Sequence, residues 1–231
     1  MLCSKYLFLV LIFISSIAYA KARDPLEVQL PILDVIPGAQ WYWVGEHMAV
    51  NNIPMSVRLF SYSGEKKELE KYYLSEWKMK GHGKLRQRNV GDLKILSYEL
   101  DGFLYSVQFS QKGDVVDGKL VVSPTPLNYK SDMNSSLPLA PKSRVANKVE
   151  TIETGRRSET LTVDSKLPWK QLEAYYLDQL TNDSWVKYSR SENGAGSVTS
   201  FQREGELLQL TIKGLQGRNS SFSQALIHWL K

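Results

Sequence analysis

The strongest pattern of apolar positions in the chain occurs twice. The residues of the first copy stand at positions i, i+3, i+4 and i+8, and they are Leu69, Tyr72, Tyr73 and Trp77. The residues of the second copy have the same spacing 103 positions later, and they are Leu172, Tyr175, Tyr176 and Leu180. This spacing forms one apolar stripe along an amphipathic helix. We therefore predict a helix capped by Ser63 that ends near Lys80, and a second helix capped by Asp164 or Ser165.

Alternating apolar and polar residues predict strands around each helix. Tyr105, Val107 and Phe109 alternate with polar residues, and the same alternation recurs 103 positions later. Period two with one apolar face is typical of an antiparallel sheet that is solvated on its other face, and a helix stripe needs such an apolar face to pack against. The predicted fold class is therefore α+β, with two tandem repeats that each pack an antiparallel β-sheet on one α-helix in the order ββαββββ.

The ends of the predicted repeats follow from charge and proline content. Lys5, an apolar run and Ala18-Tyr19-Ala20 predict a cleaved signal peptide, while a retained anchor is the alternative, although the run is shorter than the roughly 20 residues of a spanning helix. Four prolines mark a linker between the repeats. The predicted segments are a signal peptide at 1–20, an arm at 21–35, a first repeat at 36–123, a linker at 124–141 and a second repeat at 142–231.

Cysteine usage indicates the compartment. The single cysteine, Cys3, lies inside the signal peptide, so the mature chain would have none. Exported eukaryotic proteins usually carry disulfides, and a cysteine-free exported protein therefore favours a bacterial periplasm. We predict a periplasmic or secreted bacterial protein without a transmembrane segment after signal cleavage.

One helix across a bent antiparallel sheet, present twice in an exported chain, resembles the helix-grip arrangement. The resemblance rests on the order of elements and on the helices that carry Tyr72-Tyr73 and Tyr175-Tyr176. Tandem domains of this kind occur in the BamC-type lipoprotein of the bacterial outer-membrane barrel-assembly machine. The resemblance implies an accessory, interaction-type role in the cell envelope.

Basic residues cluster after the first predicted helix. The formal net charge is +5, a mild excess that favours anionic surfaces without implying nucleic acid. Lys84, Arg86 and Arg88 would share one face of a strand, because side chains alternate with period two. The candidate anion or partner surface is Lys80, Lys84, Arg86 and Arg88. Its ligand could be an anionic lipid, a polysaccharide or an acidic protein, and the alternative is a charged edge strand that resists pairing.

A second candidate surface is the aromatic run Trp41, Tyr42 and Trp43. Neighbouring residues of a strand face opposite sides, so Tyr42 cannot share the core face with both tryptophans. A large apolar side chain must therefore be exposed or covered by another part of the chain or by a partner.

Catalytic and metal-binding patterns are missing from the sequence. His47, His82 and His228 do not have the short spacings of a metal site, and no Gly-x-Ser-x-Gly motif occurs. We predict no catalytic residues, no metal and no cofactor.

The predicted function is therefore non-enzymatic. We expect a periplasmic accessory or assembly factor for secretion, pilus or outer-membrane biogenesis that binds an envelope protein. The alternative is a carrier or sensor of an amphipathic or anionic small molecule or lipid, which would need a cavity beside the tyrosines of the helices. An enzyme is a third possibility that would need a cleft with convergent histidine and carboxylate groups.

Overall fold

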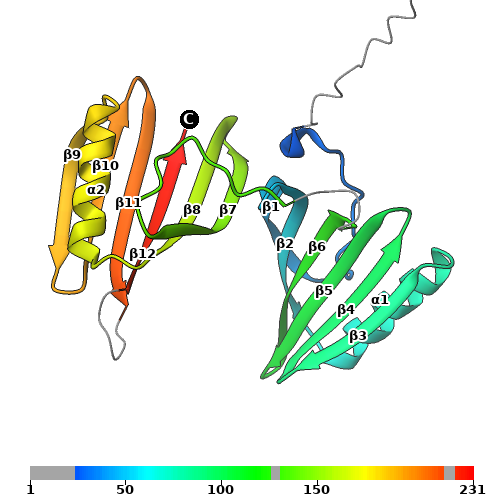
Figure 1. Ribbon diagram of the computed structural model, residues 1–231. Coiled ribbons are helices and arrows are strands. Elements are labelled where there is room, and N and C mark those ends of the chain that lie inside the picture. The colour runs from blue at the N-terminus through cyan, green and yellow to red at the C-terminus, as the bar shows by residue number, and fades with distance from the viewer. Residues whose placement is uncertain (1–23, 126–130, 216–221) are drawn as a thin grey trace, which may run out of the picture.

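The computed structural model describes residues 24–125, 131–215 and 222–231. The predicted signal peptide at 1–20 lies outside the described residues, as do the first three residues of the predicted arm and part of the predicted linker. Two α-helices, one 3-10 helix and twelve strands make up the described chain (Figure 1). In chain order they are η1 (Pro25–Glu27), β1 (Gln40–Val50), β2 (Ile53–Ser63), α1 (Lys66–Met79), β3 (Lys84–Val90), β4 (Leu93–Leu100), β5 (Phe103–Lys112), β6 (Val115–Pro124), β7 (Ser143–Glu153), β8 (Arg156–Ser165), α2 (Trp169–Asn182), β9 (Val186–Asn193), β10 (Gly196–Arg203), β11 (Glu206–Leu215) and β12 (Phe222–Leu230).

All twelve strands belong to one antiparallel sheet. Their order is β3-β4-β5-β6-β2-β1-β7-β8-β12-β11-β10-β9, so β3 and β9 form its two free edges. The two halves of the sheet meet where the end of β1 pairs with β7. In that short ladder Met48, Ala49 and Val50 lie opposite Thr151, Glu150 and Val149.

The predicted fold class is wrong. The chain does not form two α+β repeats with a sheet each: it is mostly β, with one twelve-stranded sheet and two helices of 14 residues. The alternation of side chains shows which residues face a core, but it does not show which strands exchange backbone hydrogen bonds. The β1–β7 pairing satisfies backbone groups that two separate sheets would expose, and this merges them.

The two helices lie at the apolar stripes, but they begin later than the predicted caps. The helix α1 is capped by Glu65, whose backbone N–H donates to the Glu68 carboxylate over 3.1 Å, and not by Ser63. The helix α2 begins after Pro168, where a missing backbone donor costs nothing. Each helix lies against its own half of the sheet (Figure 1).

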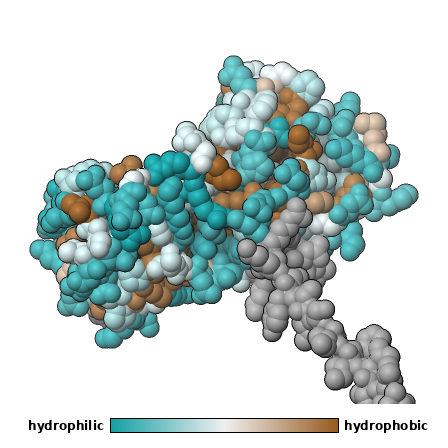
Figure 2. Space-filling model, turned by 90° about the horizontal axis from the view of Figure 1, so that it is seen from above, coloured by the Kyte–Doolittle hydropathy of each residue, from teal (hydrophilic) through white to brown (hydrophobic). Residues whose placement is uncertain are grey.

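Each helix packs its stripe into a separate core. The core beside α1 includes Leu69, Tyr73 and Trp77, and the indole of Trp77 stacks on the ring of Tyr98 with centroids 5.4 Å apart. The core beside α2 includes Leu172, Tyr176 and Leu180, all about 1% exposed or less. Neither of the two α-helices in the described part of the chain covers the other face of the sheet. Seen from above in Figure 2, the described surface is mostly hydrophilic, with smaller hydrophobic patches.

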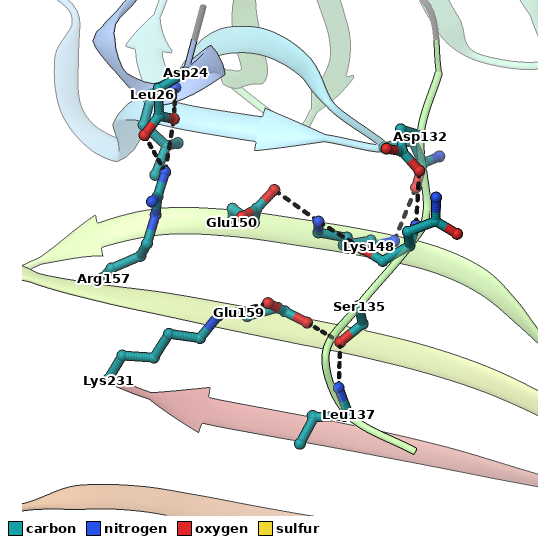
Figure 3. A network of polar contacts seen from close by, with 12 residues as sticks. Asp24, Leu26, Asp132, Ser135, Leu137, Lys148, Glu150, Arg157, Glu159 and Lys231 are labelled. Carbon is teal, nitrogen blue, oxygen red and sulfur yellow. Dashed lines mark hydrogen bonds and ion pairs between the residues drawn. The ribbon is translucent and has the colours of Figure 1, made fainter. Parts of the chain in front are cut away.

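Polar contacts hold the two halves together at the β1–β7 junction (Figure 3). The turn residue Asn51 accepts a hydrogen bond from the backbone N–H of Lys148 and donates its own N–H to the Lys148 carbonyl, both at 2.8 Å. Within β7 itself, the ammonium of Lys148 lies 3.1 Å from the Glu150 carboxylate, next to this junction. Arg157 donates to both carboxylate oxygens of Asp24 at 2.6 Å and so ties the N-terminal arm to β8.

The predicted linker lies along the second half only from Ser135 onward, because Pro124 still belongs to β6 and the backbone N–H of Asp132 donates to the carbonyl of Asn51. The hydroxyl of Ser135 donates to the buried carboxylate of Glu159, which also pairs with Lys231 at 2.8 Å (Figure 3). Leu137 and Ala140 are buried in the core beside α2. These contacts anchor the segment before β7 begins.

Candidate binding surfaces

Strand β3 is a free edge of the sheet that no described segment of the chain covers. All seven residues from Lys84 to Val90 are exposed, so neither face of the strand is buried by a helix or loop. The strand joins β4 through a two-residue turn at Gly91 and Asp92, where Gly91 has a φ of 57°. An exposed edge of this kind presents unpaired backbone N–H and C=O groups to any extended segment that approaches it.

The sheet places three of the predicted cationic residues together. Leu85 and Gln87 lie opposite Tyr98 and Leu96, which are buried on the α1 face. Because side chains alternate along a strand, the intervening residues project from the other face of the sheet. This cationic row consists of Lys84, Arg86 and Arg88.

The cationic row has no carboxylate partner among the residues that the structure describes. Across β4, Arg86 lies opposite Ser97 and Arg88 lies opposite Ile95, while Lys84 lies opposite Glu99 without an ion pair. Lys80, the fourth predicted member, is exposed at the C-cap of α1 and stands outside the strand. The structure therefore groups Lys84, Arg86 and Arg88 and leaves Lys80 apart.

The other free edge, β9, uses its arginine differently. All eight residues of β9 are exposed overall, but Arg190 donates to both carboxylate oxygens of Glu173 on α2 at 3.0 Å. Arg190 also reaches Glu192 at 2.5 Å. Burial raises the pKa of the Glu173 carboxyl, but the hydrogen bond and charge of Arg190 outweigh it, so that pKa lies below its ordinary value.

The aromatic run divides between the two faces of the sheet, as alternation requires. Trp41 and Trp43 enclose the guanidinium of Arg58 on β2, which lies 5.0 and 4.6 Å from their ring centroids. Arg58 is 7% exposed and donates to the carbonyl of Leu33 in the arm. Burial lowers the pKa of this guanidinium, while the negative charges of Asp34 and Glu46 act in the opposite direction. Both tryptophans therefore contribute to a clamp that holds the arm on the sheet.

Tyr42 projects from the opposite face and is 62% exposed. It lines a shallow groove of about 690 Å³ together with Leu59, Gln108 and Lys119. Register places these four residues in one row across β1, β2, β6 and β5. Because this row depends on strand order, the sequence pattern could not reveal that Leu59 and Lys119 belong to it. The pattern also did not predict a role for Arg58. A charged residue at a core-facing position of a strand was the signal that could have indicated one.

The histidines form no site. His228 lies on β12, where its Nδ1 is 2.9 Å from the hydroxyl of Thr160. Over the described ranges 24–125, 131–215 and 222–231, no three histidine, cysteine or acidic residues group as metal ligands. The same residues include no helix with the length and apolarity of a membrane span.

Comparison of the chain with protein-family models, with curated proteins and with solved structures returned no match. The resemblance to BamC-type domains therefore stays a prediction.

Proposed function

We propose that this protein is a non-enzymatic binding protein of the bacterial cell envelope, acting in the periplasm as an accessory or assembly factor. It binds another envelope protein at the β3 edge of its sheet. The observation that carries this proposal is the edge itself, because seven consecutive residues are exposed on both faces and bear three cations that pair with no carboxylate in the described part of the chain. An extended segment of a partner can add to such an edge through backbone hydrogen bonds, while side chains supply specificity.

The packing beside α1 argues against a ligand carried between helix and sheet. The space next to Tyr72, Tyr73 and Trp77 measures about 10 Å³, whereas small-molecule sites occupy roughly 300–1,000 Å³. The side chains of Tyr73 and Trp77 are each about 1% exposed. Interior storage of a lipid therefore has no support from this half of the molecule.

The groove beside Tyr42 favours a second candidate function. At about 690 Å³ it has the volume of a small-molecule site, and it sets Tyr42 and Leu59 beside the exposed cation of Lys119. The lining also includes the carboxylate of Asp117, which is bound by Ser61 and Lys112, so an amphipathic anion would suit the part of the groove beside Lys119. Fluorescence titration of the Tyr42→Ala and Lys119→Glu variants with a short-chain fatty acid would test it, and unchanged binding by both would remove this candidate.

Site-specific photo-crosslinking in intact cells tests the main proposal. A photoreactive residue in place of Gln87, on the exposed β3 edge, should capture one discrete envelope protein. The matched control is the same residue in place of Tyr188 on β9, which is 58% exposed and should not capture that protein. Crosslinks to lipid alone, or turnover on a panel of envelope substrates, would contradict the proposal.

A further inference from the structure

The β3–β4 turn determines which backbone groups of β3 point outward. Val90 and Leu93 flank a two-residue turn and lie opposite each other, so they form a hydrogen-bonded pair. Alternation then directs the backbone groups of Arg88, Arg86 and Lys84 toward β4 as well. The outward N–H and C=O groups belong to the remaining residues of the strand, which are Leu85, Gln87 and Asn89.

This alternation places the cationic row where an added strand would approach it most closely. A strand that adds antiparallel exchanges hydrogen bonds with Leu85, Gln87 and Asn89. Its residues opposite Lys84, Arg86 and Arg88 then form non-hydrogen-bonded pairs, in which Cα atoms lie only about 4.5 Å apart. Opposite charges in directly facing pairs stabilise a sheet, and like charges destabilise it.

Protection of an exposed edge against pairing is the rival explanation of the cationic row. The second free edge of the same sheet is evidence against this explanation. Strand β9 is equally exposed, yet its Arg190 is bound by Glu173 and Glu192, and Val186 and Tyr188 are about 60% exposed. The fold therefore tolerates a free edge that has no row of unpaired cations, and the row on β3 needs a reason of its own.

We propose that β3 is completed by an antiparallel strand of the partner protein that carries acidic side chains at alternate positions, facing Arg86, Arg88 and Lys84. This inference rests on the proposed function and names the chemistry of the partner. The acidic residues lie on the face of the sheet away from α1, where the two arginines face no carboxylate across β4. The intervening residues of the partner strand lie opposite Leu85, which is 45% exposed.

The test uses two synthetic peptides and the chain without its predicted signal peptide at 1–20. One peptide alternates threonine with glutamate, and the other has the same composition with its glutamates consecutive. We expect the alternating peptide to bind more tightly at low salt and to slow amide hydrogen exchange at Leu85, Gln87 and Asn89. Arg86→Glu combined with Arg88→Glu should weaken this binding about 10-fold or more, because two attractive cross-strand pairs become repulsive.

Two controls make the result specific. Lys187→Glu on β9 should leave peptide binding unchanged, and the double β3 variant should instead bind a peptide that alternates threonine with lysine. Circular dichroism should show that the variants fold, since Arg86 and Arg88 are fully outside the core.

Several results would overturn the inference. These are equal binding of the consecutive-glutamate peptide, unchanged exchange at the three amides, or binding only of vesicles that contain anionic phospholipid. If these occur while the crosslinker at Gln87 still captures an envelope protein, the acidic-strand inference fails and the proposed function stands. If the alternating peptide binds as expected but crosslinking in cells captures no protein, the proposed function fails separately.

Discussion

Strands β3 and β9 occupy the two ends of one sheet, and each follows the helix of its half. In the second half, Glu173 on α2 binds Arg190 on β9, so the edge strand is tied to its helix. The corresponding helix residue of the first half, Glu70, instead pairs with Lys94 on β4 at 2.7 Å. The carboxylate of α1 is thus engaged one strand inside the edge, and the β3 cations lie on the opposite face.

This difference distinguishes a charge that helps to hold the fold together, on Arg190, from charges that no described residue neutralises, on Arg86 and Arg88. Arg190 is neutralised within the chain, and its guanidinium contributes to holding β9 against α2. Arg86 and Arg88 have the same chemistry and comparable exposure of their strand, but nothing described in this chain neutralises them. Desolvating a cation is costly unless an anion replaces its water, so an acidic segment would suit the β3 row better than an apolar one.

The largest expected loss of stability comes from truncating a core residue of a helix, and it should differ between the two cores. Trp77→Ala should lower the free energy of unfolding by about 3–5 kcal/mol, because it removes a buried indole that stacks on Tyr98. Leu180→Ala, at the corresponding position of α2, should cost less, about 2–3 kcal/mol. Urea denaturation of both variants measures these values. A Trp77→Ala midpoint equal to that of the parent protein would show that this stack does not stabilise the first half.

The two edge arginines should differ in their effect on stability. Arg190→Ala should clearly lower the unfolding midpoint, because it leaves the carboxylate of Glu173 buried without its cation. Arg88→Ala should change stability by no more than about 0.5 kcal/mol, as is usual for an exposed residue without partners. Thermal unfolding of the two variants in parallel measures how far each unfolding midpoint shifts, and equal midpoint shifts would contradict this prediction.

Acid should weaken the second half through Glu173. Its pKa in the folded chain lies below the ordinary value, so its contribution is complete above the unfolded pKa of about 4.3 and declines as the pH falls through the lower folded pKa. Glu173→Gln should therefore flatten the acid side of the stability profile. Denaturation midpoints between neutral pH and about pH 3 provide the measurement. A profile as steep in Glu173→Gln as in the parent would assign the acid sensitivity to other carboxylates.

The smallest expected effect concerns the exposed tyrosine. Tyr42→Ala should alter the free energy of unfolding by only about 0.5 kcal/mol, because the side chain is 62% exposed. Val145 lies 103 positions later in the chain but on the core face of β7, opposite Val163, and it packs against the core beside α2, so Val145→Ala should cost more. Chemical denaturation of the pair tests this. A large loss in Tyr42→Ala would place Tyr42 in the packing of the first half.

Prediction from the sequence worked best where the evidence was local. The stripes through Tyr73 and Tyr176 identified both helices, since burying one side of a helix requires apolar residues at its 3.6-residue period. Alternation likewise placed Lys84, Arg86 and Arg88 on one face of a strand. The helix starts were missed at Glu65 and Pro168, because the choice of a cap depends on which loop residues are free to bond the first turn.

Tertiary structure alone decided how these local elements combine. The pairing of Met48 with Thr151 joins residues far apart in the chain, and it turns the expected pair of sheets into one. Strand order likewise decided that Tyr42 and Lys119 line one groove, and helix packing decided that Arg190 has an acidic partner while Arg88 has none among the described residues. The physical reason is the range of the interactions. Periodicity and local charge are properties of neighbouring residues, whereas backbone pairing and charge neutralisation depend on which distant segments meet.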